Sequence, residues 1–200
     1  MRNNGIKGRY KRKFRVTTVA NSIQPVAANV LGRSFSPAAR NVSWAADITY
    51  VWTLEGWLYL AVVLDLFSRR VIGWATSKSI DEKLALDALD MAIAERQPKM
   101  GLVHHSDRGC QYTANTYRER LAVHGIVPSM SRRANCWDNA VVESFFHSLK
   151  TELVDGYGFA TRLAASSEIS EYISNFYNSR RLHSTIGFTT PIEYEMAAYS

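Results

Sequence analysis

Three runs near the start of the chain have the hydrophobic pattern of β-strands. They cover residues 43–53, 57–66 and 69–76 and are rich in Val, Ile, Trp and Tyr. Only residues 54–56 and a polar turn near Ser68 separate them, and connections this short predict antiparallel neighbours.

Beyond residue 80 the hydrophobic positions recur at helical spacing between shorter strand-like runs. A helix is predicted over residues 81–96, with Ser79 and Glu82 as a capping box at its start. The elements expected after it are a strand at 101–105, a helix at 113–124, a strand at 126–130, a helix carrying Glu143 to about residue 154, and a last helix at 166–178. The order βββαβαβαα predicts an α/β protein.

Three carboxylates occupy notable places in this pattern. Asp47 lies on the more polar side of the first strand, where alternate residues face opposite ways. Asp107 follows the strand predicted at residues 101–105, and open α/β sheets bind ligands at such strand ends. Glu143 lies on a helix whose other face is apolar. There are 59 residues between the first two carboxylates and 35 between the last two.

The chemistry suited to such a set is phosphodiester cleavage. Two divalent ions can stabilise the attacking and the leaving oxygen of an in-line displacement. Mg²⁺ prefers oxygen ligands and keeps several waters, so a few carboxylates suffice to hold it. A single Asp or Glu is far more often a solvated surface group than a ligand, and only the joint spacing and flanking residues of the three favour a shared site.

Five segments carry a resemblance to a known family. They are residues 8–18, 47–74 (DITYVWTLEGWLYLAVVLDLFSRRVIGW), 104–113 (HHSDRGCQYT), 131–153 (SRRANCWDNAVVESFFHSLKTEL) and 177–195. Together they resemble the integrase core of DDE transposases and retroviral integrases, most closely the transposases of the bacterial insertion sequence 3 group. The resemblance implies a ribonuclease H-like fold, in which a mixed sheet of three antiparallel strands and two further strands is flanked by helices.

The same resemblance implies a function. Asp47, Asp107 and Glu143 match the family's catalytic, metal-binding triad, and Lys150 matches a basic residue that steadies DNA seven positions after the glutamate. The expected activity is metal-dependent DNA cleavage and strand transfer of an insertion sequence, with two Mg²⁺ ions for which Mn²⁺ can substitute. The expected partners are DNA, at the element ends and the target, and further copies of the chain bound to that DNA. His104, His105 and His147 are candidates to contact the metal-binding residues without binding the metal themselves.

The positive charge is concentrated at the start of the chain. Seven of the 24 basic residues and none of the 18 acidic ones lie in the first 15 residues, so this arm accounts for the net charge of +6. Its Lys11, Arg12, Lys13 and Arg15 are predicted to contact DNA phosphates, although a basic tail could equally serve solubility. We therefore expect a basic N-terminal arm over residues 1–37 and a catalytic core with a C-terminal helical segment over 38–200.

Further DNA contacts are predicted within the core. Arg132 and Arg133 precede the Glu143 helix in a polar loop, and Trp137 in the same loop could stack on a base. Two other basic groups, Arg69 with Arg70 and Arg180 with Arg181 and His183, could each touch backbone phosphates, although surface arginines are commonplace.

Other classes of protein are disfavoured. The longest uninterrupted apolar stretch, residues 57–64, is too short to cross a bilayer. Cys110 and Cys136 form no disulfide framework and lack the paired spacing of a zinc site. These features favour a cytoplasmic protein, which the resemblance would place at the bacterial nucleoid. Two alternatives stay open: a ribonuclease H-like nuclease without strand transfer, and a truncated, inactive DNA-binding remnant of a transposase.

Overall fold

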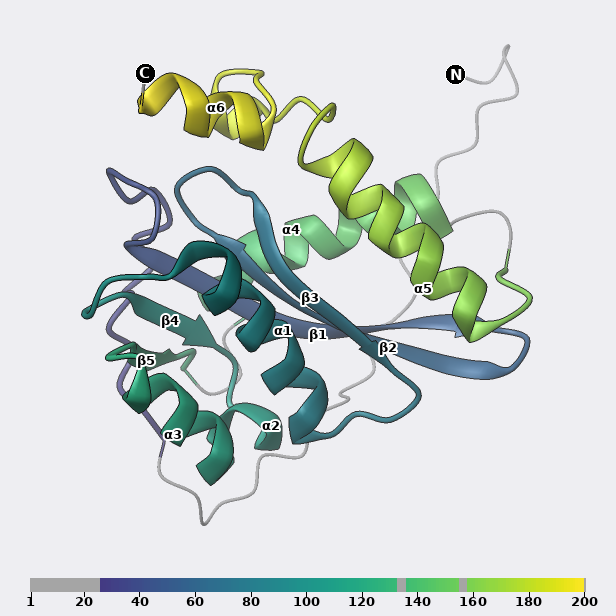
Figure 1. Cartoon of the computed structure of the whole chain (residues 1–200), viewed down its shortest axis with the longest axis horizontal. Helices are drawn as coiled ribbons and strands as arrows, with labels where there is room; N and C mark the ends of the chain where they lie inside the picture. The colour runs from purple at the N-terminus through teal and green to yellow at the C-terminus, as the bar shows by residue number, and fades with distance from the viewer. Residues whose placement is uncertain (1–25, 133–135, 155–157, 200) are drawn as a thin grey trace.

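A five-stranded mixed sheet forms the centre of the protein (Figure 1). The structure, a computed structural model, describes residues 26–132, 136–154 and 158–199. The strands are β1 (Ser43–Thr53), β2 (Gly56–Asp65), β3 (Val71–Ser77), β4 (Val103–Ser106) and β5 (Val127–Met130), in the order β3-β2-β1-β4-β5. The first three pair antiparallel, and β4 and β5 join the sheet in parallel with β1. The predicted mixed sheet is confirmed.

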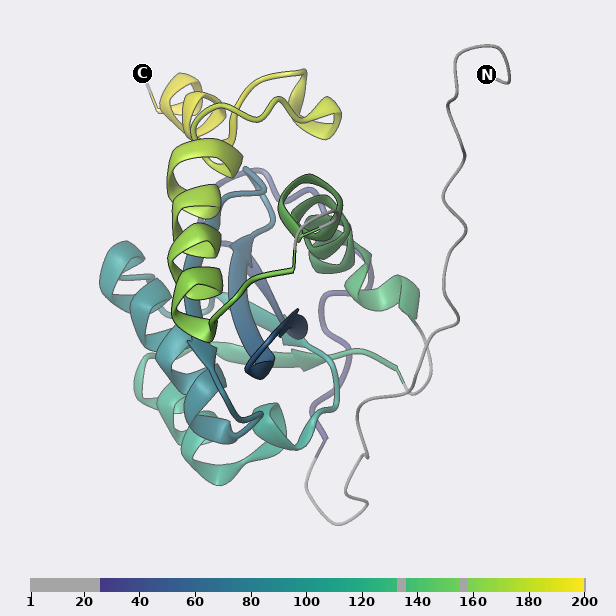
Figure 2. The same ribbon diagram turned by 90° about the vertical axis from the view of Figure 1, so that its right-hand side faces the viewer.

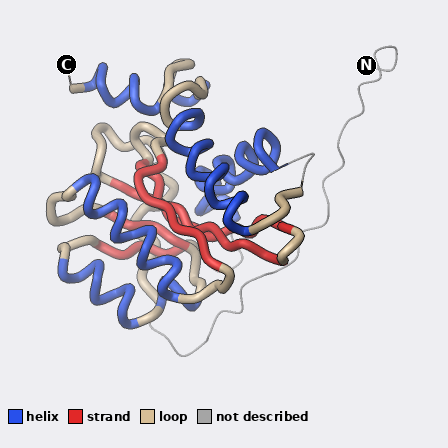
Figure 3. Tube along the Cα trace, turned by 45° about the vertical axis from the view of Figure 1, so that its right-hand side comes forward, coloured by secondary structure: helices blue, strands red, loops and turns tan. Residues whose placement is uncertain are grey.

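Helices cover both faces of this sheet (Figures 2 and 3). The α-helices are α1 (Glu82–Arg96), α2 (Cys110–Thr113), α3 (Asn115–Val123), α4 (Ala140–Leu149), α5 (Arg162–Glu171) and α6 (Pro191–Ala198). Short 3-10 turns lie at Cys136–Asn139 and Ser184–Ile186, and π-helical turns at Lys150–Val154 and Tyr172–Tyr177 extend α4 and α5. No helix in the described ranges is long and apolar enough to span a membrane.

Some local features differ from the prediction. The helix expected over residues 113–124 is α3, and the short helix α2 ahead of it was not predicted; the chain is extended at Ala114 between the two. The capping box expected of Ser79 and Glu82 does not form; Asp81 caps α1 by accepting a hydrogen bond from the backbone N–H of Leu84. The final helix, α6, was not predicted at all.

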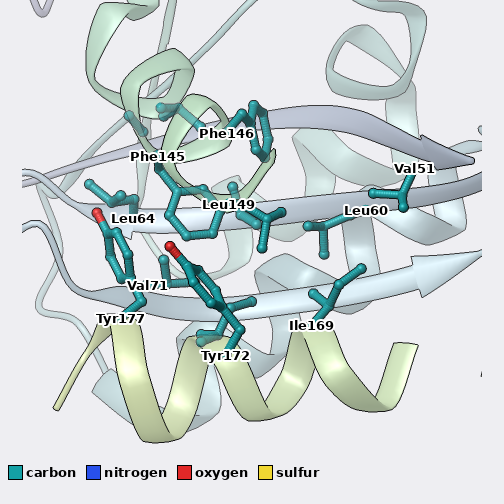
Figure 4. Packing of buried hydrophobic residues seen from close by; sticks show 14 of the residues in the cluster. Val51, Leu60, Leu64, Val71, Phe145, Phe146, Leu149, Ile169, Tyr172 and Tyr177 are labelled. Atoms are coloured by element: carbon teal, nitrogen blue, oxygen red, sulfur yellow. The ribbon is translucent and has the colours of Figure 1, made fainter. Parts of the chain in front are cut away.

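The alternation of side chains along β1 divides the interior into two cores. Trp44 and Ala46 point to the face covered by α1, α2 and α3, whereas Ala45 and Val51 point to the face covered by α4 and α5. Figure 4 shows the second core, where side chains of both helical segments meet over β2 and β3. Because β1 is central in the sheet, both of its faces are largely buried, including the side that carries Asp47.

Candidate active site

The register between β1 and β4 places two of the predicted carboxylates together. Ser43 pairs with Val103 and Ala45 with His105, so every pair in this parallel ladder differs by 60 positions. The same offset carried two residues further sets Asp107, the first residue after β4, beside Asp47. Asp47 and Asp107 are 60 positions apart in the sequence, which is the register offset between β1 and β4, so the sheet brings them side by side.

Asp47 lies at the centre of the acidic group. The side chain is half-buried, and its Oδ1 accepts a hydrogen bond of 2.8 Å from the N–H of Ile48. Burial, together with the charge of Asp107 and to a smaller extent that of Glu143, raises the pKa of Asp47 to about 8. Since like charges raise a carboxyl pKa only over short distances, all three predicted carboxylates converge on one region.

Asp107 is held by the turn that follows β4. Its Oδ1 accepts a hydrogen bond of 2.8 Å from the N–H of Gly109, which favours the charged form. Burial acts more strongly in the other direction and raises the pKa of Asp107. Arg108 anchors the turn by donating from Nε to the carbonyl of Ser131 at 2.8 Å.

Glu143 projects from α4, whose apolar side fixes its position. Val142, Phe145 and Leu149 are buried against the sheet, while Glu143 stays exposed in the first turn of the helix. Partial desolvation raises the pKa of Glu143. The helix thus presents its carboxylate at the edge of the space beside Asp47.

Asn139 joins the site, although sequence reasoning placed it only in a polar loop. Its Nδ2 donates to the carbonyl of Ala46 at 3.3 Å, and its side-chain amide also lowers the pKa of Asp47 in part. Its Oδ1 is buried and accepts no hydrogen bond from the described residues. The signal available in the sequence was an amide four residues before Glu143, one helical turn away.

Lys150 approaches the same acids from the end of α4. Its Nζ lies 5.0 Å from the centre of the Tyr50 ring, within cation–π distance. Burial lowers the pKa of Lys150, and the negative charge of Asp47 acts in the opposite direction. A half-buried ammonium group therefore lies beside the carboxylates.

The predicted DNA contacts around α4 differ in their surroundings. Arg132 binds Asp138 through Nε at 3.0 Å and Nη2 at 2.9 Å, so its guanidinium takes part in a structural ion pair. Trp137 is 68% exposed and is accessible for stacking. Arg133 and the arm residues Lys11, Arg12, Lys13 and Arg15 lie outside the described residues, so their contacts stay predictions.

Two of the candidate histidines have structural partners. The ring of His104 bonds the Tyr117 hydroxyl at 3.1 Å, and burial lowers the pKa of His104 to about 3. The two ring nitrogens of His105 lie 2.9 Å and 3.1 Å from the hydroxyls of Ser129 and Ser131. These bonds hold β4 to its neighbours, whereas His147 is exposed on α4.

The donor set suits a hard divalent cation. Three carboxylates, a buried amide oxygen and one ammonium group share the site, and oxygen ligands are those that Mg²⁺ prefers. In the part of the chain that the structure describes, no three His, Cys, Asp or Glu side chains surround a single point closely enough to form a metal cage. Sites that take one or two carboxylates per Mg²⁺, with waters and substrate phosphates completing the shell, need no such cage.

Known sequences that match this chain are integrase core domains and proteins of insertion elements. A family model described as integrase core domain matches residues 37–136, and a second with the same description matches residues 143–198. A 31 kDa protein of insertion element IS600 from Shigella sonnei is 45% identical over 189 residues, which are 94% of this chain and 70% of that protein. Transposase InsF of insertion sequence IS3A from Escherichia coli K12 is 43% identical over 195 residues, covering 98% of this chain and 68% of the relative.

Solved structures show the same fold at low sequence identity. A chain of the simian T-cell lymphotropic virus intasome in complex with PP2A regulatory subunit B56 gamma superimposes with a TM-score of 0.66 at 19% identity, over 88% of this chain and 60% of that chain. The HTLV-2 integrase catalytic core domain in complex with magnesium gives a TM-score of 0.58 at 18% identity, over 79% of this chain and 98% of that one. The predicted ribonuclease H-like fold is thereby confirmed.

Proposed function

This chain belongs to the integrase core domain family as a DDE-type insertion sequence transposase, and from that premise we propose that Asp47, Asp107 and Glu143 form its catalytic site. The proposed reaction is cleavage of a DNA strand at the element end and transfer of the released 3′ hydroxyl to another phosphodiester. The observation that carries the proposal is the 60-residue register of β1 and β4, which brings Asp47 and Asp107 together beside the helix of Glu143.

We propose that two Mg²⁺ ions, or Mn²⁺ in their place, complete this site. Asp47 with Asp107 would hold one ion and Asp47 with Glu143 the other, which accounts for a central carboxylate that interacts with both of its neighbours. When bound, such ions activate the attacking oxygen and stabilise the leaving one. The Oδ1 of Asn139 is a further acceptor at the same place, suited to a water or an ion.

The surrounding side chains would bind and orient the DNA. Lys150 would contact a phosphate next to the scissile one, and the position of its ammonium group beside Asp47 supports this role. Trp137 is proposed to stack on an exposed base, and Arg133 and the N-terminal arm to contact phosphates. Arg132 would act mainly by fixing the loop through Asp138, with its remaining donors free to approach DNA.

We further propose that several copies of the chain assemble on DNA, in the bacterial cytoplasm at the nucleoid. Support comes from the insertion sequence relatives and from the intasome, in which the structural neighbour functions. Joining an element's two ends to one target requires more than one active site acting together.

The test of this function is replacement of Glu143 by Gln, which keeps the side chain's size and removes its charge. We expect Mg²⁺- or Mn²⁺-dependent cleavage to fall by at least about 100-fold, because a metal ligand is removed. DNA affinity and melting temperature should be unchanged. Glu171→Gln, at an exposed position of α5, is the matched control and should cleave normally.

Two readouts decide the result. Near-normal cleavage by Glu143→Gln would remove this residue from the mechanism. A strand-transfer assay with a pre-cut DNA end separates a transposase from a nuclease, because a nuclease that only hydrolyses DNA would yield no joined product from that substrate.

A further inference from the structure

A pocket lies beside α4, on a face of the helix next to the one that carries Glu143. It has two adjoining parts of about 230 Å³ and 290 Å³, which share Ser144, Tyr177, His183 and Thr185 as lining residues. The first part reaches Arg69, two residues before β3, and the second reaches Arg181. Two basic groups that are far apart in sequence thus meet at one place, which we call the Arg69 pocket.

Arg69 supplies a buried positive charge to this pocket. The residue is only 9% exposed, and its Nη1 donates to the carbonyl of Phe35 at 2.8 Å. Among residues 26–132, 136–154 and 158–199 no carboxylate forms an ion pair with it, and Asp65 affects it only weakly. A buried charge without a counter-ion is costly, so a cation kept in this state favours an anionic ligand.

His183 supplies a buried polar atom without a partner. The residue is 8% exposed, its ring packs edge-on against Tyr177 at 4.7 Å, and its Nε2 makes no hydrogen bond within the described part of the chain. Its Nδ1 lies 3.5 Å from Nη1 of Arg181. A guanidinium can only donate, so this contact is compatible with a proton on Nε2, which would make Nε2 a donor to a ligand.

The remaining lining is also rich in donors. Hydroxyl groups of Ser144, Ser148, Ser184 and Thr185 border the two parts, and neither part is lined by a described Asp or Glu. The carboxylate that binds Arg181 is Glu152, and it also accepts a hydrogen bond from the Tyr172 hydroxyl. A pocket with two guanidinium groups, an imidazole and several hydroxyls matches a tetrahedral oxyanion such as a phosphate group.

We propose that the Arg69 pocket binds a phosphodiester of the DNA strand that enters the catalytic site. This inference rests on the proposed function and adds a binding site to it. Ser144 and Ser148 are one helical turn apart on α4, and their stripe adjoins the one formed by Glu143 and His147. A strand held at the pocket would therefore run along the helix that carries the third carboxylate, and the pocket would fix its position relative to the scissile bond.

The test places a carboxylate in the pocket without disturbing the core. Thr185 is exposed at the rim, so Thr185→Glu should fold normally while repelling a phosphate. The control with the same charge change is Ser167→Glu, at an exposed position of α5 that does not line the pocket. Arg69→Gln removes the buried charge itself, and its melting temperature shows whether the variant folds.

Binding of a fluorescein-labelled duplex is measured as a function of salt. We expect Thr185→Glu and Arg69→Gln to weaken binding about tenfold, as removal of a charge-assisted hydrogen bond would. The slope of log affinity against log salt should decrease by roughly 0.9, which corresponds to one phosphate contact. Ser167→Glu should bind within about twofold of the parent chain, a change in the range of a screened surface charge.

A second arm identifies the source of the phosphate. Inorganic phosphate should shift the His183 ring resonances, and unlabelled duplex should displace it. A shift that duplex does not reverse would overturn the DNA assignment in favour of a small anion. Equal losses of duplex affinity for Thr185→Glu and Ser167→Glu, or no loss for Thr185→Glu, would overturn the proposed pocket. If the parent chain still cleaves DNA in that case, the proposed function is unaffected. A parent chain that neither binds nor cuts DNA would overturn both.

Discussion

At the scale of single residues, Asp138 fixes the segment that leads into Glu143. Its side chain is fully buried and accepts hydrogen bonds from Arg132 and from Nε of Arg33 at 2.8 Å. Nδ2 of Asn29 adds a bond of 3.1 Å. One carboxylate therefore ties the chain ahead of β1 to the 3-10 turn at the start of α4, and thereby helps to set where Glu143 lies.

Asp138→Asn should reduce stability in a way that depends on pH. The hydrogen bonds from Arg132 hold the pKa of Asp138 well below its usual value. A lowered pKa stabilises the fold fully at every pH above the pKa in the unfolded chain, about 3.9, and this contribution declines as the pH falls below that value towards the pKa in the folded chain. Urea unfolding at pH 7 and pH 3 should therefore show a larger loss of stability for the variant at pH 7. A loss that is equal at both pH values would contradict the ion-pair account.

The sequence predicted which charged residues belong to the site, but it predicted their contacts less well. Asp47, Asp107, Glu143 and Lys150 were identified by resemblance, and the structure brings them into one region. The partnership of Arg132 with Asp138 was not foreseen, because a basic residue in a polar loop has the same sequence pattern whether it meets DNA or a buried carboxylate.

At the scale of elements, α1 packs unusually close to β3 at Gly73. A Cβ atom on Gly73 would lie 2.2 Å from the carbonyl oxygen of Ala88 and 2.8 Å from the backbone nitrogen of Ala92. Both contacts are with backbone, which cannot rotate away as a side chain can. The glycine is therefore needed for the close approach of helix and strand.

Gly73→Ala should separate α1 from the sheet and lower the free energy of unfolding by about 1–3 kcal/mol, the usual cost of overpacking. Gly158→Ala is the matched control, because a Cβ there has no neighbour within 4 Å in the described structure. Urea denaturation of the two variants measures the difference. Equal stability of the two variants would mean that the helix shifts at no cost.

Elements were predictable where the pattern is strong and local. The first three strands and α1 were placed within about two residues, the usual spread between boundary definitions. The helix α6 was missed although its signal was present: Thr190 and Glu193 form a capping box, and Pro191 occupies the first turn. Its burial depends on distant partners, since Glu195 of α6 binds Arg96 of α1 at 2.6 Å, and such a contact cannot be read from local sequence.

At the scale of the whole molecule, the site exists only because the sheet order brings distant segments together. The sequence placed Asp107 at a strand end, where α/β proteins hold ligands. It did not contain the register that aligns β4 with β1, because parallel pairing between strands so far apart is set by how the whole sheet packs. The family resemblance predicted that Asp47, Asp107 and Glu143 converge, which the hydrophobic periodicity could not predict.

The charge of the whole chain gives the last prediction. Its basic excess lies in residues 1–15, where seven cationic side chains face no acidic neighbour in sequence, while the three carboxylates proposed as catalytic all lie in the core. Each phosphate that a cationic group contacts releases condensed counterions on binding. Deleting residues 1–15 should therefore weaken binding to any duplex and reduce the salt slope by up to roughly 0.9 for each phosphate that the arm neutralises.

The same deletion should leave the chemistry intact. Because phosphate contacts carry no base information, affinity should fall about equally for element-end and random duplexes, as competition titrations would measure. Cleavage at saturating DNA and low salt should persist, since the triad is unchanged. If affinity and salt slope stay at their original values, the arm is a solubilising tail. The phosphate contacts would then have to come from the core, where Lys150, Arg133 and the Arg69 pocket are the groups to test next.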